Sequence, residues 1–145
     1  AAGVERLWWW NLTAQPFPKL GLDPSFGKMR LMDETLRTKL PSFHAFERMA
    51  AKLDGAKGAR RIPVGQNDIY LFEVEGRDNN RFFVVWEKRD LFKGEDQPAT
   101  NYPLQVAARN VRVTDVFGKQ TTSEVVGGKV VLRVSDSPLY VEVLD

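Results

Sequence analysis

The sequence has no cysteine and a single histidine, and neither sign of charge dominates it. Without cysteine, the chain can form no disulfide, no thiolate metal site and no cysteine nucleophile. Lysine and arginine total 21 against 19 acidic residues, for a formal net charge of +2. No dense basic block occurs, so the charge pattern of a nucleic-acid-binding protein is missing. No apolar run is long enough to span a membrane, and no acidic loop has calcium-site spacing. We therefore expect no metal, no cofactor, no nucleic acid and no membrane partner, whereas secreted, periplasmic and cytoplasmic locations in a bacterium all stay open.

Most of the chain, residues 59–145, alternates short apolar-rich runs with turn signals. Within these runs the apolar residues recur with a period of two, as on a half-buried strand. Residues 81–87 are apolar on both faces, which predicts a central strand. Gly127 and Gly128 form a two-residue hairpin signal between residues 125–126 and 130–134. Several strands without intervening helices predict an antiparallel β-sandwich domain over residues 59–145.

A different pattern fills residues 1–55, which we treat as a strand-loop-helix unit. Residues 4–12 contain three consecutive tryptophans and are apolar on both faces, as in a buried strand. A long loop rich in proline and glycine follows. A helix is then predicted over residues 42–53, with Ser42 as its N-cap. One face of this helix is apolar and must pack on something, and the other is polar; the apolar face comprises Phe43, Phe46, Met49, Ala50 and Leu53.

Several stretches, in this order along the chain, resemble the end of a TIM-barrel glycoside hydrolase. Residues 3–10 (Gly-Val-Glu-Arg-Leu-Trp-Trp-Trp) resemble the eighth barrel strand, and residues 39–53 resemble the eighth barrel helix. Residues 111–119 (Val-Arg-Val-Thr-Asp-Val-Phe-Gly-Lys) and 137–143 (Ser-Pro-Leu-Tyr-Val-Glu-Val) resemble the ancillary β-sandwich that closes such proteins. The fold that this implies is mainly β, with the antiparallel sandwich preceded by the last β/α unit of a barrel.

The resemblance also implies where the catalytic groups lie. Barrel enzymes carry their active sites at the carboxyl ends of the strands, and glycosidases use two carboxylates there. In the family these lie on the fourth and seventh strands, whereas this chain is expected to start at the eighth. We therefore assign no catalytic residue and expect the chain to be inactive alone. Its expected partner is a catalytic barrel upstream of residue 1.

Aromatic side chains are the candidates for contact with carbohydrate, because sugar rings stack on aromatic faces. A tryptophan at the end of the eighth strand would lie beside the reacting sugar, so the candidates are Trp8, Trp9 and Trp10, with Asn11 just beyond. The alternative is that two of these tryptophans belong to the barrel core. In the sandwich, Tyr102 beside Pro103 is expected in an exposed loop, since residues 91–107 break the strand pattern, whereas Trp86 is expected in the core.

Other polar residues are better explained by solvation. The single histidine, His44, falls on the polar face of the predicted helix and has no orienting partner at a suitable spacing. Glu73 and Glu75 share one face of a strand, which we expect to be the solvated outer face. Two alternatives to the glycosidase fragment remain open. One is a free-standing carbohydrate-binding module, and the other is an interaction module that self-associates through residues 4–12 and the helix 42–53.

Overall fold

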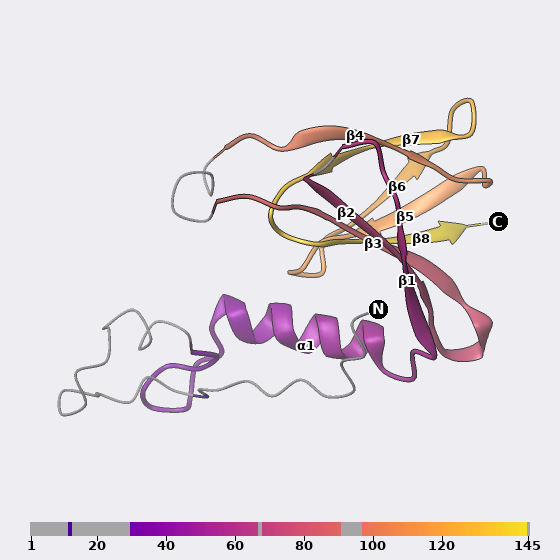
Figure 1. The fold of residues 1–145 in the computed structure, drawn as a ribbon. Coiled ribbons are helices and arrows are strands. Elements are labelled where there is room, and N and C mark those ends of the chain that lie inside the picture. The colour runs from indigo at the N-terminus through magenta and orange to yellow at the C-terminus, as the bar shows by residue number, and fades with distance from the viewer. Residues whose placement is uncertain (1–11, 13–29, 67, 91–96, 145) are drawn as a thin grey trace.

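The computed structural model describes residues 12, 30–66, 68–90 and 97–144. In these ranges one α-helix precedes eight strands (Figure 1). The elements are α1 (Pro41–Leu53), β1 (Gly58–Ile62), β2 (Ile69–Glu75), β3 (Arg81–Glu87), β4 (Thr100–Gln105), β5 (Asn110–Thr114), β6 (Gln120–Glu124), β7 (Lys129–Val134) and β8 (Leu139–Leu144), with a short 3-10 turn at Arg77–Asn79.

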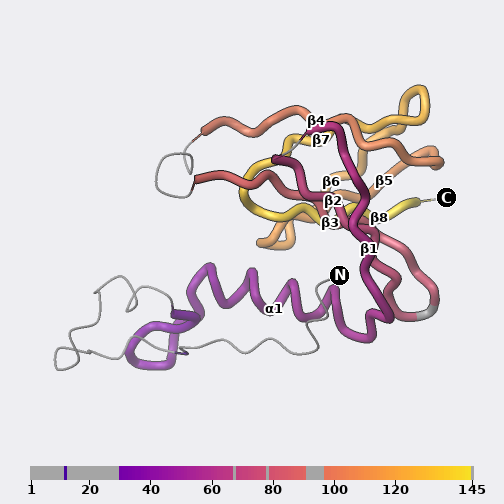
Figure 2. The backbone as a smooth tube through the Cα atoms, in the orientation of Figure 1, coloured from indigo at the N-terminus to yellow at the C-terminus, as the bar shows by residue number. Residues whose placement is uncertain are grey.

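The strands form two antiparallel sheets, which confirms the predicted mainly-β sandwich. One sheet has six strands in the order β1-β2-β3-β8-β5-β6, and the other pairs β4 with β7. As predicted, β3 is central, since it pairs with β2 on one side and β8 on the other. The β4–β7 sheet covers one face of the large sheet, and α1 lies on the opposite side (Figures 1 and 2).

The core fills the space between the two sheets. Alternate residues of β7 are buried, and they face the buried residues of the six-stranded sheet. This alternation is what a strand with one solvated face requires. Val85, Val111 and Val141 of the large sheet and Val134 of the small one have no exposed surface. A second, smaller cluster of Val74, Phe82 and Tyr140 lies on the outer face of the six-stranded sheet.

The predicted hairpin at Gly127 and Gly128 is only partly right. Both glycines have positive φ, 58° and 74°, as the tight turn requires. The pairing around the turn stops after a single bridge between Val126 and Lys129. Beyond it, β6 pairs with β5 and β7 pairs with β4, so the chain crosses from one sheet to the other at this turn. Local sequence signals the turn, but the partner of each strand is a long-range choice.

The helix begins one residue earlier than predicted, and Ser42 is not its cap. The N-cap position is Leu40, whose side chain cannot cap, and Pro41 occupies the first turn, where its missing N–H costs nothing. The Ser42 hydroxyl instead donates a 2.5 Å hydrogen bond to the carbonyl oxygen of Arg30. This bond ties the start of α1 to the preceding segment, where Leu31 and Met32 donate to the carbonyl of Leu12.

The buried alternation of β7 makes a matched pair of substitutions informative. Leu132 is 3% exposed, whereas its neighbour Val131 is 65% exposed on the other face of the same strand. Leu132→Ala should lower the free energy of unfolding by about 2–5 kcal/mol, because it leaves a cavity between the sheets. Val131→Ala should change it by less than about 0.5 kcal/mol. Urea unfolding followed by fluorescence measures both, and equal losses would contradict this assignment of faces.

Candidate functional site

The predicted sugar-contacting residues divide into two groups. Trp8, Trp9, Trp10 and Asn11 lie outside the described residues, so their role stays a prediction. Tyr102 lies in β4, not in an exposed loop, and its side chain points into the core with 9% exposure. The expectation that it is exposed is therefore wrong. Pro103, which suggested a loop, is accommodated within the short two-stranded sheet, opposite Val131.

The aromatic surface of the sandwich lies elsewhere, on the outer face of β2 and β3. Tyr70, Phe72 and Trp86, here called the aromatic row, are half-buried there. Trp86 was expected in the core, but it lies between the other two rings. Its centroid is 5.4 Å from that of Tyr70 and 5.4 Å from that of Phe72, with interplanar angles of 15° and 3°. Arg61 from β1 covers the Tyr70 ring at 4.5 Å.

This stacking limits what the aromatic row can bind. A sugar platform needs an open ring face, whereas these rings direct their faces at one another and at the Arg61 guanidinium. Such contacts stabilise the sheet, since aromatic pairs and cation–π contacts each contribute about 0.5–1.5 kcal/mol. The aromatic row is therefore better explained as packing within the sheet than as a platform for carbohydrate.

Sheltered carboxylates could in principle serve as acid or base, but Glu73, Glu87 and Glu142 are each paired with a cation. The Glu73 side chain is 20% exposed and accepts a 2.7 Å hydrogen bond from Arg60. It is less solvated than predicted, whereas Glu75 is exposed. The hydrogen bond from Arg60 outweighs desolvation and lowers the pKa of Glu73. A general acid needs the opposite shift, so Glu73 is unsuited to that role.

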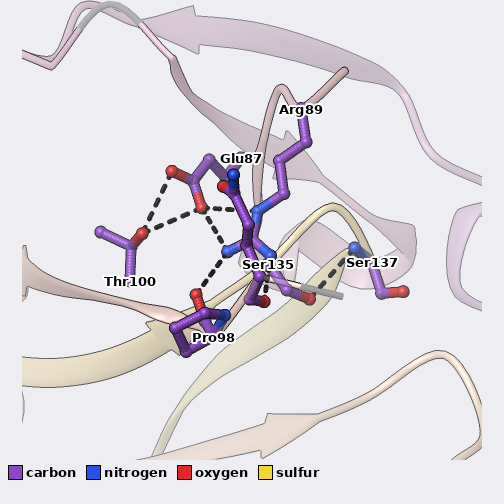
Figure 3. Close-up of polar contacts among 7 residues, drawn as sticks. Glu87, Arg89, Pro98, Thr100, Ser135 and Ser137 are labelled. Carbon is purple, nitrogen blue, oxygen red and sulfur yellow. Dashed lines mark hydrogen bonds and ion pairs between the residues drawn. The ribbon is translucent and has the colours of Figure 1, made fainter. Parts of the chain in front are cut away.

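A buried arginine organises the end of the sandwich where β3 leaves and β4 enters (Figure 3). The Arg89 side chain is 4% exposed, and both Nε and Nη2 donate to Glu87 Oε2, at 3.0 and 2.7 Å. Its guanidinium also donates to the carbonyl oxygens of Gln97 and Pro98, at 2.5 and 2.9 Å. The Thr100 hydroxyl donates to the same Glu87 carboxylate, at 3.0 Å to Oε2. All of these groups find their hydrogen-bond partners within the chain, so the cluster is structural rather than a binding site. We call Arg89, Glu87, Thr100 and the two carbonyl groups the clasp.

An ion pair connects α1 to the sandwich. Lys52 Nζ lies 2.7 Å from Glu142 Oε1 on β8, and both side chains are 18% exposed. No local sequence pattern predicts this pair, because 90 positions separate the partners. His44, in contrast, has a half-exposed side chain 3.6 Å from Glu47, as expected for a solvated helix residue.

Metal and membrane sites do not emerge from the described ranges. No group of three or more potential metal-ligating side chains is found within them. No helix there is long and apolar enough to cross a membrane.

Comparison with known proteins identifies a similar solved structure. The chain matches no protein-family model and no curated protein. Among solved structures it is similar to a family 39 glycoside hydrolase from the gut symbiont Bacteroides cellulosilyticus WH2, with a TM-score of 0.59 and 21% identity. The chain shares the fold of part of that enzyme. The match covers 86% of this chain but only 24% of the solved chain. Similarity at this identity concerns the fold, and it is compatible with an ancillary domain.

The clasp at Arg89 predicts a local stability effect. Arg89→Lys keeps the charge but loses the fork that reaches Glu87 and two carbonyl oxygens together. We expect the free energy of unfolding to fall by about 1–3 kcal/mol, the usual loss when buried polar groups lose their partners. The control is Arg133→Lys, at an exposed position of β7, which should change stability by less than about 0.5 kcal/mol. Indistinguishable urea midpoints for the two variants would show that the clasp contributes nothing.

Proposed function

We propose that this chain is an ancillary region of a glycoside hydrolase, a β-sandwich with the helix before it, which stabilises a catalytic domain. The fold match supports this, because the chain corresponds to 24% of the glycoside hydrolase that it resembles. The ion pairs of the sheltered carboxylates also support it, since Glu73, Glu87 and Glu142 each pair with a cationic side chain. A glycosidase needs a carboxylic acid with a raised pKa beside a second carboxylate.

The observation that carries the proposal is the orientation of α1. Lys52, on its polar side, contacts Glu142 of the sandwich. Ala50 is two residues from Lys52 and therefore about 200° around the helix. Ala50 and Leu53 are exposed, Leu53 by 40%, and no residue of α1 is fully buried. An amphipathic helix normally turns its apolar side to its own core. Here two members of the apolar face, Ala50 and Leu53, are exposed, whereas the other three, Phe43, Phe46 and Met49, are half-buried. Part of that face is therefore open to a second domain.

The aromatic row makes a free-standing carbohydrate-binding module the weaker alternative. Its ring faces are occupied by one another and by Arg61, so less surface is left for sugar stacking. A module that binds other proteins would share the exposed apolar side of α1, and it differs from our proposal only in the partner. The catalytic partner is favoured by the match to a glycoside hydrolase chain.

The proposal predicts that the complete gene product hydrolyses aryl glycosides, whereas the 145-residue chain alone does not. Both can be assayed on a panel of 4-nitrophenyl glycosides, with the same chain run on affinity gels of common polysaccharides. Turnover by the short chain, or no turnover by the complete product, would overturn the proposal. Retardation on a polysaccharide gel would favour the carbohydrate-binding module instead.

A substitution on the exposed side of α1 tests the stabilising role. In the complete gene product, Leu53→Glu should place an unpaired charge in the interface and lower the melting temperature, by about 2–4 °C for each kcal/mol lost. His44→Gln, on a solvated part of the same helix, should leave the melting temperature unchanged. In the 145-residue chain alone, Leu53→Glu should have no such effect, because the side chain is already solvated. Equal effects in both proteins would place the partner of Leu53 inside this chain.

A further inference from the structure

Glu142 on the outer face of the six-stranded sheet is an ion-pair partner of α1. Its Oε1 lies 2.7 Å from Lys52 Nζ, and its Oε2 lies 3.8 Å from Arg112 Nη1 on the neighbouring strand β5. Glu142 and Arg112 are cross-strand partners in register. The Glu142 side chain is 18% exposed, so these two cations offset part of the cost of burying its charge.

A second contact joins α1 to the turn between β5 and β6. Asp115 Oδ1 accepts hydrogen bonds from the backbone N–H groups of Phe117 and Lys119, each at 2.9 Å, which fixes the turn. Gly118 in this turn has a φ of 90°, a conformation that favours glycine. A Cβ at position 118 would lie 2.8 Å from Cζ of Arg48 and closer still to Nη2. The Arg48 guanidinium thus occupies the space that the missing side chain leaves.

Arg48 also lies close to strand β8. Its Nε is buried, with no hydrogen-bond partner among the described residues. Burial raises the pKa of Tyr140 on β8, and the nearby charge of Arg48 partly offsets this rise. Tyr140 and Glu142 lie two residues apart on β8 and share one face of the strand. Arg48 and Lys52 are four residues apart, so they too share one face of their helix.

We propose that Gly118 and Glu142 form a two-point seat that fixes the rotation of α1 about its own axis. Arg48 engages one point and Lys52 the other. With both engaged, Ala50 and Leu53 must face away from the sandwich, where the partner domain would bind. Only this last step rests on the proposed function, because the contacts of Gly118 and Glu142 with α1 are the same whatever the partner is. The sandwich would then stabilise the catalytic domain by holding α1 in a defined orientation.

The seat can be tested in the 145-residue chain by hydrogen exchange at the amides of α1. Gly118→Ala should speed their exchange by about tenfold while the amides of β3 and β7 keep their protection. The matched control is Gly127→Ala. That glycine also has a positive φ, 58°, but nothing lies within 4 Å of a Cβ placed there. The control carries the same kind of backbone penalty without the contact to Arg48, so α1 should exchange as in the parent chain.

Double-variant measurements separate contact from backbone strain. In an Arg48→Ala background, Gly118→Ala should add much less to the exchange of α1 than it does alone, because the clashing side chain is gone. Glu142→Gln should speed exchange of α1, whereas Glu124→Gln, at an exposed position of β6, should not. Unchanged exchange in both Gly118→Ala and Glu142→Gln, or an equal effect of Gly127→Ala, would overturn the seat.

The complete gene product tests the last step separately. Gly118→Ala should shorten the half-life of its glycosidase activity on heating, and Gly127→Ala should do so far less. If the seat is established in the short chain but both half-lives are equal, the orientation of α1 does not transmit stability to the catalytic domain. Absence of any glycosidase activity would overturn the proposed function and leave the exchange results for the seat intact.

Discussion

Burial of one face of the six-stranded sheet against β4 and β7 is the constraint on which the rest of this structure depends. Apolar surface removed from water contributes roughly 25 cal/mol per Å². The fully buried side chains Val85, Val111, Val134 and Val141 lie in that contact or at its margin. Once this contact has formed, the other face of the large sheet has to shield its apolar residues and pair its charged residues without help from the core. It does so with the aromatic row at one end and the polar seat for α1 at the other.

Helix α1 follows a different rule from the sheets. A helix usually packs through its apolar face, but α1 is attached to the sandwich by the long side chains of Arg48 and Lys52, with no fully buried residue of its own. Polar contacts of this kind are individually weak, yet they are directional. They are better suited to setting an orientation than to supplying stability, which fits the proposed position of α1 between two domains.

The local sequence was a good guide wherever a feature depends on neighbours in the chain. The period of two predicted β2, β3 and β8, and the central position of β3 followed from its two apolar faces. The Asp115 side chain accepts hydrogen bonds from the backbone of its own turn, which is typical of aspartate in turns. The loop expected at Tyr102 was wrong, because Pro103 and flanking polar residues hide the alternation of β4 around Tyr102 and Leu104.

By itself, the sequence determined the mainly-β class, the presence of one amphipathic helix and the absence of cysteine chemistry, because these depend on composition and periodicity. The tertiary structure decided which sheet each strand joins, as at Gly127, where two strands predicted to pair separate instead. It also decided which face of α1 meets the sandwich and placed Trp86 outside the core. These choices depend on contacts between residues far apart in the chain, such as Lys52 and Glu142, whose free energies no local pattern records.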